Sequence, residues 1–253
     1  MQHEMRAKFG LSLSTRAILF DWGTMDDLVE AAIVAEESGF FSGVWVGDNL
    51  LSKPRVEAVV ALSAIAARTK RITLGTICLA SFVMRDPVLL ALQWASLDIL
   101  SKGRTVLAVC NGGSASDGPQ FAQELENMDV ASNERVGRLI EGIQVMRRLW
   151  SEDSVTHQGR FYNFSKLEAL PKPVQQPSIP IWVGGHTRLA LRRTAKYGDC
   201  WHTTRQTPEF VAGHIPRLRR YTEQAGRDPD AISISLKRSS PVLASVTVLT
   251  SSV

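Results

Sequence analysis

The sequence predicts an α/β protein in which helices pack over parallel β-strands. Short apolar segments alternate with amphipathic helical segments along the 253 residues, and this alternation is typical of repeated β–α units. Nearly every residue of the predicted strands is apolar, as in sheets that are buried on both faces. Two architectures meet these conditions: an open doubly wound sheet, and a closed eightfold barrel, which typically has about 250 residues.

The first half of the chain begins with a predicted strand over 8–13. Thr24 then starts a helix, because Asp27 follows three residues later in an arrangement like a capping box. Pro87 suits the first turn of a later helix. The alternation continues with a strand over 42–46, a helix over 56–63, a strand over 71–79, a helix over 87–99 and a strand over 104–109.

The second half contains a long helix over 133–150 and then a proline-containing extended segment, which we interpret as an insertion at 151–178. Three further strands (180–183, 199–202, 231–236) alternate with two helices (187–197, 208–225). A last strand over 242–249 has no helix before it. We therefore predict one domain, 1–253, in which a barrel either closes in a shortened way or is truncated.

Composition excludes several classes of protein. The 29 Lys+Arg and 25 Asp+Glu are spread along the chain, and 44% of the residues are hydrophobic, as in ordinary globular proteins. This supports neither nucleic acid nor membrane binding, and no signal peptide or metal-binding histidine motif is recognisable. Three cysteines are too few for a disulfide framework, which favours a cytoplasmic protein. We expect Cys78 and Cys110 to pack as small hydrophobic residues.

In both architectures, ligands bind beyond the carboxyl ends of the strands. There the sequence Trp-Val-Gly-Gly-His-Thr (182–187) runs from a strand into a helix. Glycines allow close approach to backbone amides, and a helix start attracts anions, so Gly184, Gly185, His186 and Thr187 form a candidate phosphate site. An ordinary glycine turn is the alternative. Asn111 and Gly112 follow another predicted strand. They too could bind an anion through their backbone or simply form a loop.

Three polar residues at strand ends are candidates for catalysis. Asp48 could orient a ligand or hold a proton, or it could form a salt bridge that only shapes its loop. Asn49 follows it, and His202 ends the sixth predicted strand and could face the pocket or be structural. Dinucleotide, P-loop and serine-hydrolase motifs are not found.

Several segments together resemble the luciferase-like oxidoreductases. Glu37-Ser38-Gly39-Phe40 and Val44-Trp45-Val46-Gly47-Asp48 are similar to one long motif of that family. The resemblance covers residues 9–236 and its motifs occur in the family's order. Further motifs are found at 69–76, 85–87, 97–104, 134–150, 170–175, 180–185 and 197–201.

This resemblance implies a (β/α)8 TIM barrel, shortened at the C-terminus, that binds coenzyme F420 or, as the alternative, FMN. Gly184, Gly185 and the following helix start would hold the cofactor phosphate. Thr76, Ile77 and Cys78 would back the ring, with a cis peptide at Thr76–Ile77 or Ile77–Cys78, as in F420-using relatives. Asn111 and Gly112 would line the other side of the ring.

The motifs resemble the F420-dependent branch more closely. The resemblance therefore implies hydride transfer to or from a small organic substrate. The alternatives are an FMN-dependent monooxygenase and a non-catalytic cofactor-binding or assembly protein. Asn49 stands where many relatives have histidine, and asparagine cannot carry a proton at neutral pH. Exposed apolar edges of a shortened barrel would favour a homodimer.

Overall fold

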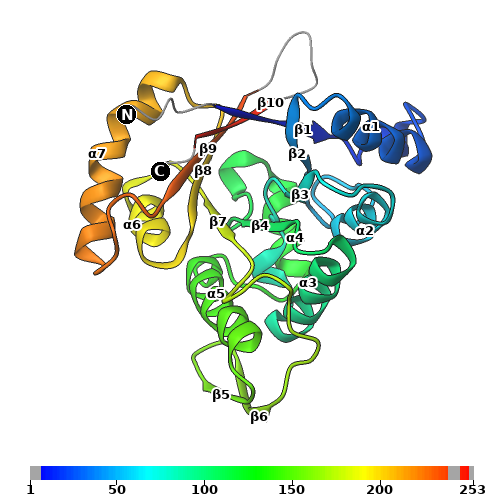
Figure 1. The fold of residues 1–253 in the computed structure, drawn as a ribbon. Coiled ribbons are helices and arrows are strands. Elements are labelled where there is room, and N and C mark those ends of the chain that lie inside the picture. Colours follow the sequence, from blue (N-terminus) through cyan, green and yellow to red (C-terminus); the bar gives the residue numbers. More distant parts are fainter. Residues whose placement is uncertain (1–6, 239–245, 251–253) are drawn as a thin grey trace.

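The computed structural model describes residues 7–238 and 246–250, and within them eight strands close into a barrel (Figure 1). Their order around the barrel is β1-β10-β9-β8-β7-β4-β3-β2. The closed barrel is thus the correct one of the two predicted architectures. The strands are β1 (Lys8–Leu13), β2 (Phe41–Val46), β3 (Thr73–Thr76), β4 (Thr105–Val109), β7 (Ile181–Gly184), β8 (Cys200–Thr204), β9 (Ser233–Arg238) and β10 (Val246–Thr250).

The barrel closes through a strand that runs against the others. β10 pairs antiparallel with β9 on one side and with β1 on the other, whereas the remaining barrel pairs are parallel. The predicted last strand over 242–249 is therefore confirmed in its second part, and residues 239–245 lie outside the described residues. Closure is shortened, as expected, because β10 follows β9 without a described helix between them.

Helices cover the outside of the barrel (Figure 1). Thr24 and Asp27 form the predicted capping box at the start of α1, and Pro87 lies in the first turn of α3, where Asp86 caps the helix. These local signals fix where both helices begin. The helices are α1 (Met25–Glu37), α2 (Ala58–Arg68), α3 (Pro87–Ser101), α4 (Pro119–Asn127), α5 (Arg135–Ser151), α6 (Arg188–Tyr197) and α7 (Pro208–Gln224).

The sequence did not predict α4 or the internal structure of the insertion. α4 is short, and its buried residues include Glu124 beside Phe121 and Leu125, so its apolar stripe is too brief to recognise. The predicted extended insertion contains a two-stranded antiparallel sheet, β5 (Val155–Gln158) and β6 (Asn163–Leu167). Both strands are largely exposed, which explains their weak apolar signal.

β3 is shorter than the strand predicted over 71–79. Before it, the carboxylate of Glu36 accepts hydrogen bonds from the backbone amides of Lys70, Arg71 and Ile72, so these amides do not enter the sheet. After it, the Ile77–Cys78 peptide is cis, which confirms one of the two predicted positions. Pairing resumes at Leu79, which bridges to Val109 of β4.

The barrel interior is filled by side chains below the carboxyl ends of the strands. Trp45 of β2 and Trp182 of β7 pack with their ring centroids 4.6 Å apart, among Ile77, Val106, Ala108 and Cys200. A larger core lies between the strands and the helices, from Leu13 to Val183. The interior is therefore solid under the mouth of the barrel, and the space for a ligand lies above it.

Candidate active site

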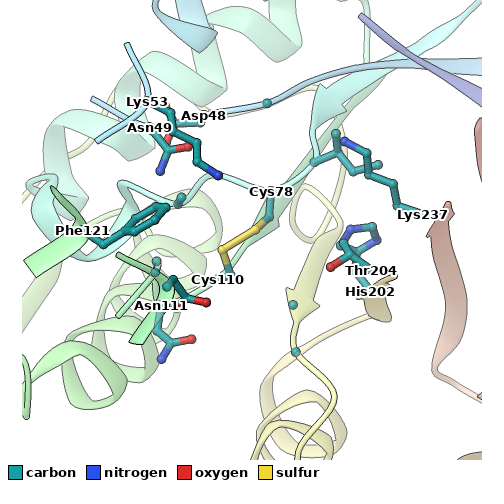
Figure 2. A pocket seen from close by; sticks show the side chains of 18 of the residues that line it. Asp48, Asn49, Lys53, Cys78, Cys110, Asn111, Phe121, His202, Thr204 and Lys237 are labelled. Carbon is teal, nitrogen blue, oxygen red and sulfur yellow. A yellow bond between two sulfur atoms is a disulfide. The ribbon is translucent and has the colours of Figure 1, made fainter. Parts of the chain in front are cut away.

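A pocket of about 520 Å³ opens at the carboxyl ends of β2, β3, β4, β7, β8 and β9 (Figure 2). This is the end of the barrel at which we predict ligand binding, and the volume suits a small-molecule site. The pocket is lined by every predicted site residue except Thr76 and Thr187, namely Asp48, Asn49, Ile77, Cys78, Asn111, Gly112, Gly184, Gly185, His186 and His202.

The two predicted residues that do not line the pocket have local structural contacts. Thr76 is fully buried, and its hydroxyl donates to the backbone oxygen of Ala108 on β4 at 2.8 Å. Thr76 therefore lies behind the pocket wall that Ile77 and Cys78 form. Thr187 is the N-cap of α6, where its side chain accepts a hydrogen bond from the amide of Ala190 at 3.2 Å.

The turn from β7 into α6 leaves no room for side chains at its two glycines. A Cβ atom at Gly184 would lie 3.0 Å from Cβ of Cys110 and 3.1 Å from the backbone oxygen of Val109. Gly185 has a φ of +129°, and a Cβ there would lie 2.8 Å from that of Ala190. Bare backbone therefore faces the pocket directly before a helix start. The Gly185 amide already donates to the backbone oxygen of His202 at 3.1 Å, so an anion here would meet the amides that follow it.

Asp48 is held by contacts with the segment that follows β3. Its carboxylate forms an ion pair with Arg85 at 3.2 Å and accepts a hydrogen bond from the backbone amide of Ser81 at 2.8 Å. The same guanidinium contacts Glu57 at 2.8 Å. With both oxygens engaged, Asp48 fixes the loops after β2 and β3 relative to each other, so its contacts favour a positioning role over proton transfer.

Asn49 belongs to a network that shapes the loop after β2. Its side chain donates to the hydroxyl of Ser52 at 3.1 Å and accepts from Arg55 at 3.2 Å. Ser52 donates in turn to the carboxylate of Glu124 on α4.

Glu124 is a residue that the sequence reasoning missed. It is buried, and it also accepts the backbone amides of Leu50 and Leu51, each at 2.7 Å. Burial alone would raise the pKa of Glu124, but the hydrogen bonds from residues 50–52 outweigh it and lower the pKa. A carboxylate in a weakly periodic segment gives no sequence signal for this role.

His202 is a buried, neutral histidine at the end of the pocket. Its Nδ1 lies 2.9 Å from the hydroxyl of Ser235, and its ring stacks on Trp182 with centroids 6.2 Å apart. Nε2 is buried and has no hydrogen-bond partner among the residues that the structure describes. Burial, and to a smaller extent Lys237, lowers the pKa of His202 to about 3. His202 is therefore a neutral side chain in the pocket wall.

The neutral state of His202 should make the protein less stable in mild acid. The unfolded chain takes up a proton at its histidine near pH 6.5, whereas folded His202 resists protonation until about pH 3. Between these values the unfolded chain binds more protons, so the free energy of unfolding falls as the pH drops below 6.5 and is restored above it. From pH 7 to pH 5.5 we expect the free energy of unfolding to fall by about 1 kcal/mol, and the His202→Asn variant should not show this fall.

Urea unfolding at each pH measures the free energy of unfolding of both proteins. If it changes with pH in the same way in the wild type and in His202→Asn, His202 is not the neutral group responsible.

Cys78 and Cys110 form a disulfide bond in the pocket wall (Figure 2). The expectation that both pack as free, small hydrophobic residues was therefore wrong. The two cysteines are 32 residues apart in sequence, and only the pairing of β3 with β4 brings them together. Cys200 is free and fully buried, which agrees with a packing role.

The pocket also contains cations that are not among the predicted site residues. Lys53, Arg55, Arg205 and Lys237 line it, against the acidic residues Asp48 and Asp117. Burial lowers the pKa of Arg55 and of Lys237, because each charged group is partly removed from water. The sequence indicated only one of these cations: Lys237 directly follows the seventh predicted strand, which ends at residue 236. The excess of positive charge favours an anionic ligand.

Within residues 7–238 and 246–250, no group of three or more His, Cys, Asp or Glu side chains could hold a metal ion. The helices of the same residues include none that combines the length and apolar character needed to cross a membrane.

Two relatives match much of the chain. An F420-dependent glucose-6-phosphate dehydrogenase of Kineococcus radiotolerans is 29% identical over 83% of this chain and 62% of its own length. One of the same name from Amycolatopsis mediterranei is 31% identical over 68% of this chain and 51% of its own length. The chain thus spans between half and two thirds of these relatives.

Solved structures share the fold. The monooxygenase RslO1 of Streptomyces bottropensis has a TM-score of 0.75 and 25% identity, over 90% of this chain and 70% of its own. An F420-dependent secondary alcohol dehydrogenase with an F420–acetone adduct has a TM-score of 0.75 and 23% identity, over 92% of this chain and 68% of its own. The family model described as luciferase-like monooxygenase matches residues 6–245. This chain therefore belongs to the luciferase-like monooxygenase family.

Proposed function

We propose that this chain is an F420-dependent oxidoreductase that transfers a hydride to or from a small organic substrate. The observation that carries the proposal is the pocket at the barrel mouth, which combines a glycine-lined helix start with several cations. The names of the F420-dependent relatives support the choice of cofactor. When bound, the deazaflavin would supply the hydride chemistry.

The residues of the pocket fit such a cofactor. Gly184, Gly185 and His186, with the start of α6 at Thr187, would hold its phosphate, since a Cβ atom at either glycine would crowd the turn. Ile77 and Cys78 would form the wall behind the ring, and Asn111 and Gly112 would line its other side. Asp48 and Asn49 would position the loops at the mouth of the pocket rather than exchange protons.

The substrate we propose is a small organic anion. Lys53, Arg55 and Lys237 line the pocket and would attract and orient a phosphate or carboxylate group. His202 would form a neutral part of the pocket wall beside the substrate. The loops that follow β2, β4 and β8 would exclude water around it.

Cofactor binding tests this proposal directly. Titration of the purified protein should quench the fluorescence of F420 with saturation, while FMN should give no saturable change. The second candidate is an FMN-dependent monooxygenase, which the match to the monooxygenase RslO1 favours. Saturable binding of FMN alone would establish that alternative. Binding of neither compound would contradict both proposals, and binding without reductant-dependent turnover would favour a non-catalytic cofactor-binding protein.

We further propose a single-domain cytoplasmic protein that forms a homodimer through α2 and α3. Val60 on α2 is 61% exposed and Leu89 on α3 is 57% exposed. Between these helices lies a groove lined by Val59, Leu92 and Leu100, with other residues of α2 and α3. A second copy of the chain would remove this apolar surface from water.

A further inference from the structure

The disulfide between Cys78 and Cys110 lies in the wall of the pocket and not in the protein core. Cys78 follows β3 and Cys110 follows β4, and their Cα atoms are 6.1 Å apart, a normal separation for a disulfide. Figure 2 shows the bond at the centre of the pocket, between Asn111 and Phe121 on one side and His202 and Lys237 on the other.

Both cysteines are reachable from the pocket. Each is half-buried, and each lines the pocket. The disulfide also adjoins the glycine turn, because a Cβ at Gly184 would lie 3.0 Å from Cβ of Cys110 and 3.7 Å from Sγ of Cys78. A small thiol that enters the pocket would therefore lie beside this bond.

The charge of the pocket favours thiol chemistry at this position. Lys53, Arg55, Arg205 and Lys237 line the same pocket, and nearby cations stabilise the thiolate form of cysteine, which is the form that reacts. Cys200 provides the contrast within the chain. It is fully buried, and burial raises the pKa of its thiol, as expected of an unreactive cysteine.

We propose that Cys78 and Cys110 are a reversible two-electron redox pair that is reduced from the pocket by a small dithiol. A thiolate of the reductant attacks one sulfur of the bond, the other protein sulfur leaves as a thiolate and takes up a proton, and the second thiol of the reductant resolves the mixed disulfide. The protein gains two thiols and the reductant becomes a disulfide. In a cytoplasmic protein, a redox-active disulfide is more typical than a permanent one. The proposal does not depend on the identity of the cofactor.

Thiol titration of the folded protein tests the proposal. After mild oxidation with oxidised glutathione, the native chain should show no reactive thiol. Brief treatment with dithiothreitol under native conditions, followed by its removal, should release two thiols per chain, and alkylation with peptide mass mapping should place them at Cys78 and Cys110. Reoxidation should remove both. Unfolding in urea should reveal one additional thiol, that of Cys200.

Two results would overturn the proposal. If both thiols still react after the oxidation, the pair does not form a disulfide in solution. If dithiothreitol releases them only in urea that unfolds the chain, the bond is a permanent cross-link. The Cys200→Ala variant is the matched control: it should release the same two thiols in the native state and show no further thiol on unfolding. In Cys110→Ser, the remaining Cys78 should react with iodoacetamide without unfolding.

Discussion

Replacing Gly184 with aspartate should abolish cofactor binding. The new Cβ would lie 3.0 Å from Cβ of Cys110 and 3.1 Å from the backbone oxygen of Val109, so these neighbours must move by a few tenths of an ångström. The carboxylate would also bring a negative charge to the place proposed for the cofactor phosphate, and like charges in contact cost several kcal/mol. We expect F420 affinity to fall by roughly a hundredfold or more, as measured by fluorescence titration.

Gly213 offers a matched control for this substitution. It lies in α7 (Pro208–Gln224), and a Cβ atom there would have nothing within 4 Å. Gly213→Asp adds the same charge to the chain and should leave the affinity unchanged. Gly184→Ala separates crowding from charge, since it introduces only the first effect. If Gly184→Asp folds and binds F420 as tightly as the wild type, the proposed phosphate site is wrong.

Asp98→Ala should cause the largest loss of stability among the substitutions considered. Asp98 on α3 is fully buried. Its carboxylate accepts a hydrogen bond from the hydroxyl of Thr105 at 2.6 Å. It also accepts one from the backbone amide of Gln175 at 3.0 Å and one from the side-chain amide of Gln175 at 2.7 Å. Removing the acceptor leaves the Thr105 hydroxyl and the Gln175 backbone amide without this partner, at a cost of about 3 kcal/mol. The Gln175 side chain still donates to the backbone oxygen of Thr105 at 2.9 Å. The melting temperature should fall by roughly 10 °C.

The exposed residue Asp153 serves as the control for Asp98. It lies in the turn after α5, and Asp153→Ala should change the free energy of unfolding by less than about 0.5 kcal/mol. Asp98→Asn keeps an acceptor and should lose less stability than Asp98→Ala. The free energy of unfolding is measured in urea or by calorimetry. Equal values for Asp98→Ala and the wild type would show that the hydrogen bonds of Asp98 with Thr105 and Gln175 do not stabilise the fold.

The barrel and the position of its pocket could be predicted from the sequence because both depend on local signals. Apolar periodicity and caps such as Thr24 specify strands and helices one at a time, and their alternation requires parallel strands. The placement of Gly184 and His202 at the mouth follows from that order alone.

The parts that could not be predicted depend on contacts between distant segments. Cys78 and Cys110 meet only because β3 and β4 pair in one particular register. That register cannot be predicted from the number of residues between the two cysteines. Glu124 binds a loop more than 70 residues earlier in the chain. The same Asp48 that reads as a catalytic carboxylate in sequence acquires its ion pair with Arg85 only in the folded barrel.

The antiparallel strand β10 has a consequence for the synthesis of this protein. Lys8 in β1 pairs with Leu249 in β10, so the contact that closes the barrel joins nearly the two ends of the described chain. While the ribosome is still translating, β1 and β9 each present an open sheet edge that has no partner, and such edges invite pairing with other chains. The barrel can therefore close only after β10 has been synthesised, and until then rapid capture of this strand would protect the open edges from aggregation.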